Sequence, residues 1–290
     1  MKKILLATTI LVGTAGFAAA EITLSGSAVM GVGDNGVNTV SKMETYVTFT
    51  GTGETDGGLS FGLSSTMATF SVTDESFADD GTSVYISGAF GKLSMGDVAE
   101  ADEVGTLSDI GGIGGLGVDN VAEAFSGDSA GRASHDINYT YSADAFSVSA
   151  STRLGANGSG DAYAIGAKYT FGDYYAGAGY NTDNEGRPNS GTVTSLYAGG
   201  TFGAVSAKAM YSTFEADAGA AFDADAFGIY AAYTMDALTI SAEYADNDRV
   251  LDAAFGIGAS YDLGGGASVT GGIANVADTT VWEAGVAMSF

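Results

Sequence analysis

The sequence predicts an all-β fold, a transmembrane antiparallel β-barrel of about sixteen strands, and three observations lead to this prediction. The final segment, Trp282 to Phe290, alternates apolar residues with polar or small ones up to the aromatic end of the chain. The same alternation recurs along residues 21–290, and the links between these runs alternate in length. Because successive side chains of a strand point to opposite faces, each run has an apolar side that protein or lipid must cover.

The predicted strands share a period of two, which is the pattern of strands with one buried face. In the second run, for example, Met43, Val47 and Phe49 share one face, and Lys42 and Glu44 share the other. In chain order the runs are Ile22–Met30, Lys42–Phe49, Leu59–Met67, Ser83–Phe90, Lys92–Gly96, Asp136–Tyr141, Ala145–Leu154, Asp161–Phe171, Tyr174–Tyr180, Val193–Phe202, Ala204–Tyr211, Asp225–Met235, Ala237–Tyr244, Asp252–Tyr261, Ala267–Ala274 and Thr280–Phe290.

The links predict two different ends of the barrel. Short links rich in turn-forming residues suit tight hairpins, and they lie at Gly91, Ser142–Asp144, Gly172–Asp173, Gly203, Met235–Ala237 and Leu263–Gly266. Longer, acidic links lie at Gly33–Ser41, Thr69–Thr82, Asp97–Ala133, Gly155–Gly160, Asn181–Thr192, Ser212–Ala224 and Ala245–Leu251. Tight turns at one end and longer loops at the other are typical of bacterial outer-membrane barrels.

The polar faces of the runs predict a water-filled interior. Hydrocarbon offers the backbone no hydrogen-bond partners, so strands can cross it only in a closed barrel. An inner face of Thr, Ser, Gly, Lys, Glu and Asp would leave unsatisfied polar groups in a dry core, and about sixteen strands enclose an aqueous channel. We therefore expect water, not a hydrophobic core, at the centre. The alternative is a soluble, secreted all-β sandwich or solenoid, but the one calcium-binding repeat pattern, Gly114–Val121, is a single copy that cannot stack.

The amino terminus predicts export through a cleaved signal peptide. Two lysines precede an apolar run from Ile4 to Val12, and Ala18–Ala20 offer a small-residue cleavage site. The predicted domains are a signal peptide over 1–20 and a barrel over 21–290. No later stretch of about twenty apolar residues predicts a membrane-spanning helix. The chain has no cysteine, so an exported fold would gain no disulfide support. Its net charge of −25 makes nucleic acid a poor partner.

The longest link, Asp97–Ala133, is the predicted functional segment, because loops of this length inside compact domains are usually functional or disordered. Folded into the lumen, it would narrow the channel and place carboxylates beside permeating solutes, which favours cations. The alternative is a solvated surface loop whose acids only keep it soluble. The segment has one base, Arg132, and its acids are Asp97, Glu100, Asp102, Glu103, Asp109, Asp119, Glu123 and Asp128.

Enzymatic chemistry finds little support in the sequence. The chain has one histidine, His135, and a catalytic histidine needs an activating acid beside it. The neighbouring Asp136 would point to the opposite face of a strand and so could not be that acid. We expect no catalytic residue, no cofactor and no transition-metal site with His or Cys spacing. Calcium bound by loop carboxylates stays open, because oxygen ligands at loose spacing suffice for it.

Four segments, Val84–Asp97, Tyr261–Ala274, Glu21–Gly26 and Tyr139–Val148, resemble the general-diffusion porins of photosynthetic alphaproteobacteria. The resemblance runs along the mature chain, with divergent outer loops. It implies a sixteen-stranded trimeric barrel among outer-membrane lipids, with the loop after the fifth strand folded inside. It also implies passive diffusion of ions and small hydrophilic solutes, calcium binding in some members, and use of Phe290 as a signal to the barrel-assembly machinery.

The resemblance further implies a basic patch on the wall facing the acidic loop, and this chain departs from it. Lys42 matches the patch, but Glu44 stands where a second base is expected, and Thr66 and Ala68 stand where the family has Lys and His. By parity four further bases face the lumen, namely Lys92, Arg153, Lys168 and Lys208. We therefore expect a cation-preferring general porin of the cell outer membrane. The alternatives are a substrate-selective channel and a non-conducting surface adhesin or anchor.

Overall fold

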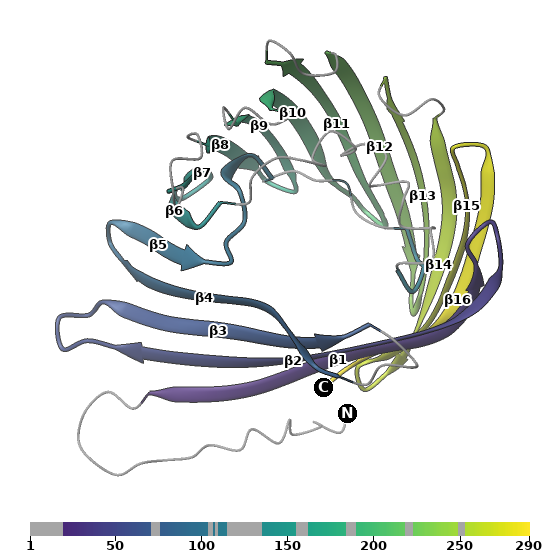
Figure 1. The fold of residues 1–290 in the computed structure, drawn as a ribbon, viewed down its shortest axis with the longest axis horizontal. Helices are drawn as coiled ribbons and strands as arrows, with labels where there is room; N and C mark the ends of the chain where they lie inside the picture. Colours follow the sequence, from purple (N-terminus) through teal and green to yellow (C-terminus); the bar gives the residue numbers. More distant parts are fainter. Residues whose placement is uncertain are drawn as a thin grey trace.

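The computed structural model is a closed barrel of sixteen antiparallel strands (Figure 1), in which each strand pairs with its neighbours in the sequence and β1 pairs with β16. It describes residues 20–70, 76–103, 107, 110–114, 135–154, 162–183, 190–217, 223–248 and 253–290. Within these ranges one short 3-10 helix, η1 (Ala101–Glu103), interrupts the strands. None of the helices among these residues is long and apolar enough to span a bilayer.

The strands cover most of the described chain, and each predicted run falls on one of them, so the predicted fold class is confirmed. They are β1 (Glu21–Asp34), β2 (Thr39–Glu54), β3 (Ser60–Thr69), β4 (Ala78–Gly88), β5 (Gly91–Gly96), β6 (Ile137–Ala143), β7 (Phe146–Arg153), β8 (Ala162–Phe171), β9 (Tyr174–Asp183), β10 (Gly191–Phe202), β11 (Val205–Ala216), β12 (Ala224–Met235), β13 (Leu238–Asn247), β14 (Ala254–Gly264), β15 (Ala267–Val276) and β16 (Thr279–Ser289).

The predicted long link at Gly33–Ser41 is wrong. β1 continues to Asp34 and β2 begins at Thr39, so a short turn remains. The Asn35 side-chain oxygen accepts the amide hydrogens of Val37 and Asn38 at 3.1 and 2.9 Å and closes that turn. The sequence did not indicate these strand ends because the alternation breaks there: the register sets Val40 opposite Gly33, on the face of Lys42, and Val32 opposite Ser41, on the other face.

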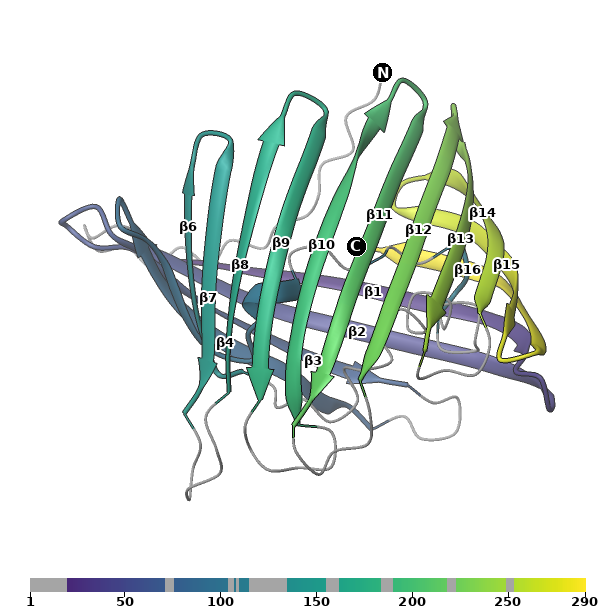
Figure 2. The same ribbon diagram turned by 90° about the horizontal axis from the view of Figure 1, so that it is seen from above.

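The two ends of the barrel differ as predicted for the other links (Figure 2). Tight turns join β6 to β7, β8 to β9 and β10 to β11 at one end, and longer links leave the opposite end of these strands. Asp144 and Asp236 sit in tight turns with φ of 50° and 49°. Aspartate tolerates this left-handed conformation better than most residues, which suits it to hairpin turns.

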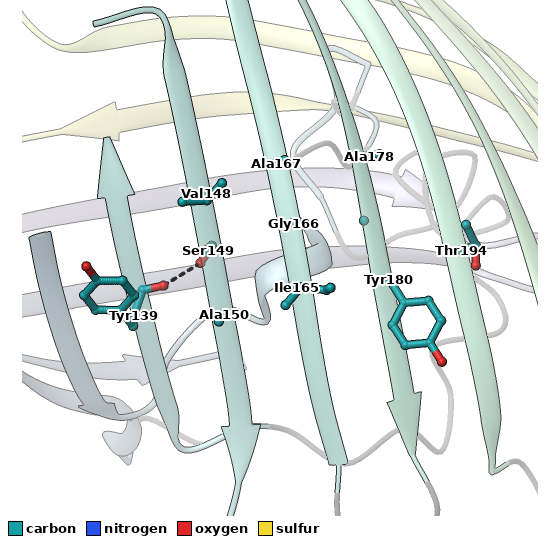
Figure 3. A pocket seen from close by; sticks show the side chains of 11 residues that line it. Tyr139, Val148, Ser149, Ala150, Ile165, Gly166, Ala167, Ala178, Tyr180 and Thr194 are labelled. Carbon is teal, nitrogen blue, oxygen red and sulfur yellow. Dashed lines mark hydrogen bonds between the residues drawn. The ribbon is translucent and has the colours of Figure 1, made fainter. Parts of the chain in front are cut away.

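The outer face of the barrel is apolar. On β16, Trp282 is 39% exposed on the outside while Glu283 is 1% exposed on the inside. A shallow apolar groove of about 580 Å³ lies on the outer surface across β6 to β10 (Figure 3), between the rings of Tyr139 and Tyr180. Alanines such as Ala167 line it between these rings. An apolar surface of this extent fits contact with acyl chains, which need no hydrogen bonds from the protein.

The inner face has two different halves. Hydroxyl side chains line the inside of β1 to β7, and several bond across strands, as between Thr48 and Thr66 at 2.9 Å. Inside β10 to β16, however, Tyr197, Met210 and Val281 form a buried cluster with Leu107 and Ile110 of the loop after β5. The expectation of a uniformly polar inner face is therefore wrong on this side, because the loop covers the wall there and excludes water from it.

The strand glycines generate a stability prediction. An alanine Cβ at Gly62 on the inner face would lie 2.5 Å from the Gly51 carbonyl oxygen and 2.8 Å from the Tyr85 ring. At Gly51 the nearest atom, in Leu63, is 3.6 Å away. Such overpacking costs about 1–3 kcal/mol. We therefore expect Gly62→Ala to lower the temperature at which heating unfolds the barrel, measured as the loss of the folded-protein band on a detergent gel. Gly51→Ala should leave that temperature unchanged, and equal shifts would contradict the close packing at Gly62.

Candidate functional site

The described parts of the loop between β5 and β6 lie against the inner wall of the barrel. The loop leaves β5 at Gly96, whose amide donates to the Asp136 carbonyl at 2.9 Å, so its two ends are held together. The 3-10 helix η1 then packs inside β7, β8 and β9 (Figure 1). Residues 110–114 reach β13 to β16 and β1, which lie further round the barrel. A loop on this path occupies part of the cross-section of the channel.

The first anchor of the loop is a set of buried polar contacts around η1. The Ala101 amide donates to Ser151 Oγ at 2.7 Å, and Ser151 Oγ lies 2.7 Å from His135 Nδ1. The Asn181 amide group donates to Glu100 Oε2 at 2.6 Å and to Asp102 Oδ1 at 3.0 Å. These contacts fix the start of the loop against the wall, since buried hydrogen bonds to charged groups are stronger than neutral ones.

The second anchor holds residues 110–114 and centres on Glu283 of β16. Its Oε1 accepts the amide hydrogens of Ile113 at 2.8 Å and of Gly114 at 3.0 Å, and its side chain is 1% exposed. Ser241 Oγ accepts the Gly111 amide at 3.1 Å. Charge-assisted bonds to backbone amides are among the stronger hydrogen bonds in proteins, so Glu283 is the main fastening point of this segment.

The backbone of the loop can approach the wall because both surfaces carry glycines. A Cβ at Gly258 of β14 would lie 2.5 Å from the Gly111 amide nitrogen, and a Cβ at Gly111 would lie 2.9 Å from the Ala259 nitrogen. Two backbones at this separation leave no room for a side chain between them. The glycines therefore form a seat for the loop, a role that composition alone did not reveal.

The acids predicted for the constriction take different positions. Asp97 is exposed and Glu100 is half-buried, whereas Asp102 is 7% exposed and turned to Asn181 on the wall. Glu103 belongs to η1. The other predicted loop residues lie outside the described ranges, and they are Asp109, Asp119, Glu123, Asp128 and Arg132. Among the residues that are described, no group of three or more acids, histidines or cysteines is arranged to hold a metal ion.

The basic residues of the wall also differ in their exposure and in their contacts. Lys42 is 8% exposed, pairs with Glu44 at 2.8 Å between Nζ and Oε1, and donates to the Gly114 carbonyl. Glu44 thus neutralises the charge of Lys42, and the hydrogen bond of Lys42 to Gly114 contributes to the second anchor. Lys92 and Lys168 each place Nζ 4.4 Å from the centre of a tyrosine ring on the inner wall. Two further bases were predicted to face the lumen, Arg153 and Lys208. The strand register places them at inward-facing positions of β7 and β11.

The sequence prediction missed the residues that hold the loop. These are Asn181, Ser151, Ser241 and Glu283, together with His135, for which the sequence indicated only that no catalytic role is expected. The one signal in the sequence was Glu283, an acid on the polar face of a terminal strand whose other polar positions are small.

Comparison with known proteins identifies the family. A family model described as Gram-negative porin matches residues 7–280. The chain belongs to the Gram-negative porin family. A porin of Rhodobacter capsulatus is 38% identical over 286 residues, covering 88% of this porin and 94% of the relative. The predicted resemblance is therefore confirmed.

Solved porins share the fold of this porin. One porin structure refined at 1.8 Å superimposes with a TM-score of 0.73 at 31% identity and covers 93% of this chain and 100% of its own. A substituted porin of Rhodopseudomonas blastica gives a TM-score of 0.73 with the same coverages, and at 21% identity it shows the fold alone. This porin is a general diffusion channel of the outer membrane, and proteins of its family are channels rather than enzymes.

The second anchor generates a prediction about the current through the channel. Glu283→Ala removes the acceptor of two amide bonds, each worth about 1.5–3 kcal/mol when the acceptor is charged, and should free residues 110–114 from the wall. Single-channel recordings should then show more frequent closures and a wider spread of open conductance than the parent. Glu283→Gln retains an oxygen acceptor, so its closure frequency and its spread of conductance should lie between those of the parent and of Glu283→Ala. Identical traces for all three proteins would show that Glu283 does not hold the loop.

Proposed function

We propose that this porin passes ions and small hydrophilic solutes by diffusion past the loop after β5, and that the passage prefers cations. The observation that carries the preference is the unequal exposure of the charges around the loop. At its start the exposed Asp97 and the half-buried Glu100 stand against one exposed base, Lys92, while Lys42 is buried and paired with Glu44. Exposed carboxylates at a narrow point attract cations and repel anions, and the chain carries a net charge of −25.

Further parts of the proposal concern export and assembly. β1 begins at Glu21, so cleavage after Ala20 would leave the whole strand in the mature barrel. Phe290 is 66% exposed and pairs with Gly26 through two backbone hydrogen bonds of 2.8 and 3.0 Å. Phe290 is thus an aromatic residue directly after β16, the strand that closes the barrel against β1. This position suits the proposed assembly signal. We propose a trimer from membership of the family.

The proposed function includes no catalysis. Ser151 and His135 lie 2.7 Å apart, as a nucleophile and its base would. They are only 5% and 3% exposed, however, and Ser151 Oγ also accepts the Ala101 amide. A substrate cannot reach this hydroxyl, so the pair supports the loop. Calcium on loop carboxylates remains a proposal from the resemblance, to be tested by titration of the purified protein with the ion.

The cation preference is tested by neutralising the two acids at the start of the loop. Asp97→Asn with Glu100→Gln should bring the reversal potential under a potassium chloride gradient toward zero, because the local field weakens. The matched control is Asp173→Asn with Asp236→Asn, which removes two acids from the tight turns at the other end. Equal effects would assign the selectivity to the overall charge, and an anion-selective parent would overturn the proposed preference.

The channel and the trimer are tested in one planar-bilayer recording of the purified full-length protein. We expect stepwise conductance in triplets and no saturation with potassium chloride alone. Single steps that never group in threes would contradict the trimer. A protein that inserts without any conductance would be an anchor or an adhesin, in conflict with the family.

A further inference from the structure

A polar cavity lies inside the barrel, beside the first anchor of the loop. It has a volume of about 410 Å³ and lies between the start of the loop after β5 and the inner wall of β4 to β7. Its lining carries charges of both signs among neutral hydrogen-bonding groups. The side chains that bear on its chemistry are Lys92, Asp97, Glu100, Asn138, Thr140 and Ser149.

The neutral part of this cavity is already ordered. Asn138 Oδ1 accepts hydrogen bonds from Thr140 Oγ1 at 3.0 Å and from Ser149 Oγ at 3.1 Å. The Asn138 amide group donates to the Ala99 carbonyl at 2.7 Å, which ties the loop to the cavity wall. A solute that enters therefore meets groups with fixed orientations, and binding costs little conformational entropy.

The charged groups stand at separate places around the cavity. Lys92 Nζ lies over the ring of Tyr85 on β4, 4.4 Å from its centre. Asp97 follows the end of β5, where its amide donates to the Thr82 carbonyl at 2.8 Å. Glu100 is held by Asn181 at 2.6 Å. One positive and two negative side chains thus line the same cavity.

The order of these groups favours a solute with a hydrogen-bonding group between its two charges. Lys92 lies near the start of β5 and Asp97 follows its end, and the register sets Asn138 opposite Ser94, between them. All three side chains line the cavity. A dipeptide carries a peptide group between its terminal ammonium and carboxylate groups, and a free amino acid has none.

We propose that this cavity is a weak binding site for dipeptide-sized zwitterions in transit. Lys92 faces the carboxylate of the solute, Asp97 and Glu100 face its ammonium group, and Asn138 and its hydroxyl neighbours bond to the peptide group. The inference rests on the proposed diffusion of solutes past the loop. It extends that function, because the channel would bind one chemical class of solute transiently. Binding has to stay weak, since a solute held tightly would block conduction.

The test compares uptake of three matched solutes into liposomes that contain the purified full-length porin. Glycylglycine carries both charges, N-acetylglycine lacks the ammonium group, and glycine N-methylamide lacks the carboxylate. We expect the glycylglycine rate to saturate in the millimolar range and the other two rates to stay linear. Linear rates for all three solutes, or saturation with all three, would overturn the proposal.

Two lysine variants assign the effect to this cavity. Lys92→Met should raise the half-saturating glycylglycine concentration about tenfold, which is a loss of one order of magnitude in affinity. Lys168→Met is the matched control, because that ammonium also lies 4.4 Å from a tyrosine ring centre on the inner wall but outside the cavity. Saturation unchanged in Lys92→Met, or lost equally in Lys168→Met, would overturn the proposal.

Potassium chloride conductance separates this inference from the proposed function. Each variant is recorded in a planar bilayer before its uptake is measured, and conducting steps show that the channel has formed. Conduction with linear glycylglycine uptake by the parent would reject the binding site alone. Absence of conduction in the parent would reject the channel, and the binding site with it.

Discussion

Backbone groups inside a lipid bilayer must find hydrogen-bond partners within the protein, and the rest of this structure depends on that constraint. The pairing of β1 with β16, from Ser27 opposite Ser289 to Asp34 opposite Trp282, removes the last open sheet edge. Closure then divides each strand into a side that meets lipid and a side that meets the lumen. The apolar exterior and the hydroxyl-lined half of the interior both follow from this division.

The interior holds a second dry region because the loop after β5 lies on the wall. Leu107 and Ile110 pack on inward apolar residues of β10 to β16, and Glu283 binds the adjacent amides. A buried carboxylate is costly unless it is well paired, and here it satisfies two backbone donors that the loop cannot pair itself. The anchor and the apolar cluster support each other, since each excludes water from the other.

The same arrangement distributes the charges of the channel. Lys42 is used by the anchor and matched by Glu44, so this base contributes little to the open lumen. Asp97 and Lys92 stay exposed near the start of the loop, beside hydroxyl groups and Asn138. Selectivity in this porin therefore depends on which ionic groups the loop buries, and counting charges in the sequence does not provide that information.

By itself, the sequence determined the strands and the face that each residue occupies, because a period of two is a local property that neighbouring residues express together. It did not determine the strand ends at Gly33–Ser41, where Val32 and Val40 lie on opposite faces and the alternation stops. Only the tertiary structure decided that Glu283 binds Ile113, which is 170 residues away, and that Lys42 binds Gly114 across 72 residues. These contacts require a closed barrel with the loop inside it, and no local pattern encodes the path of that loop.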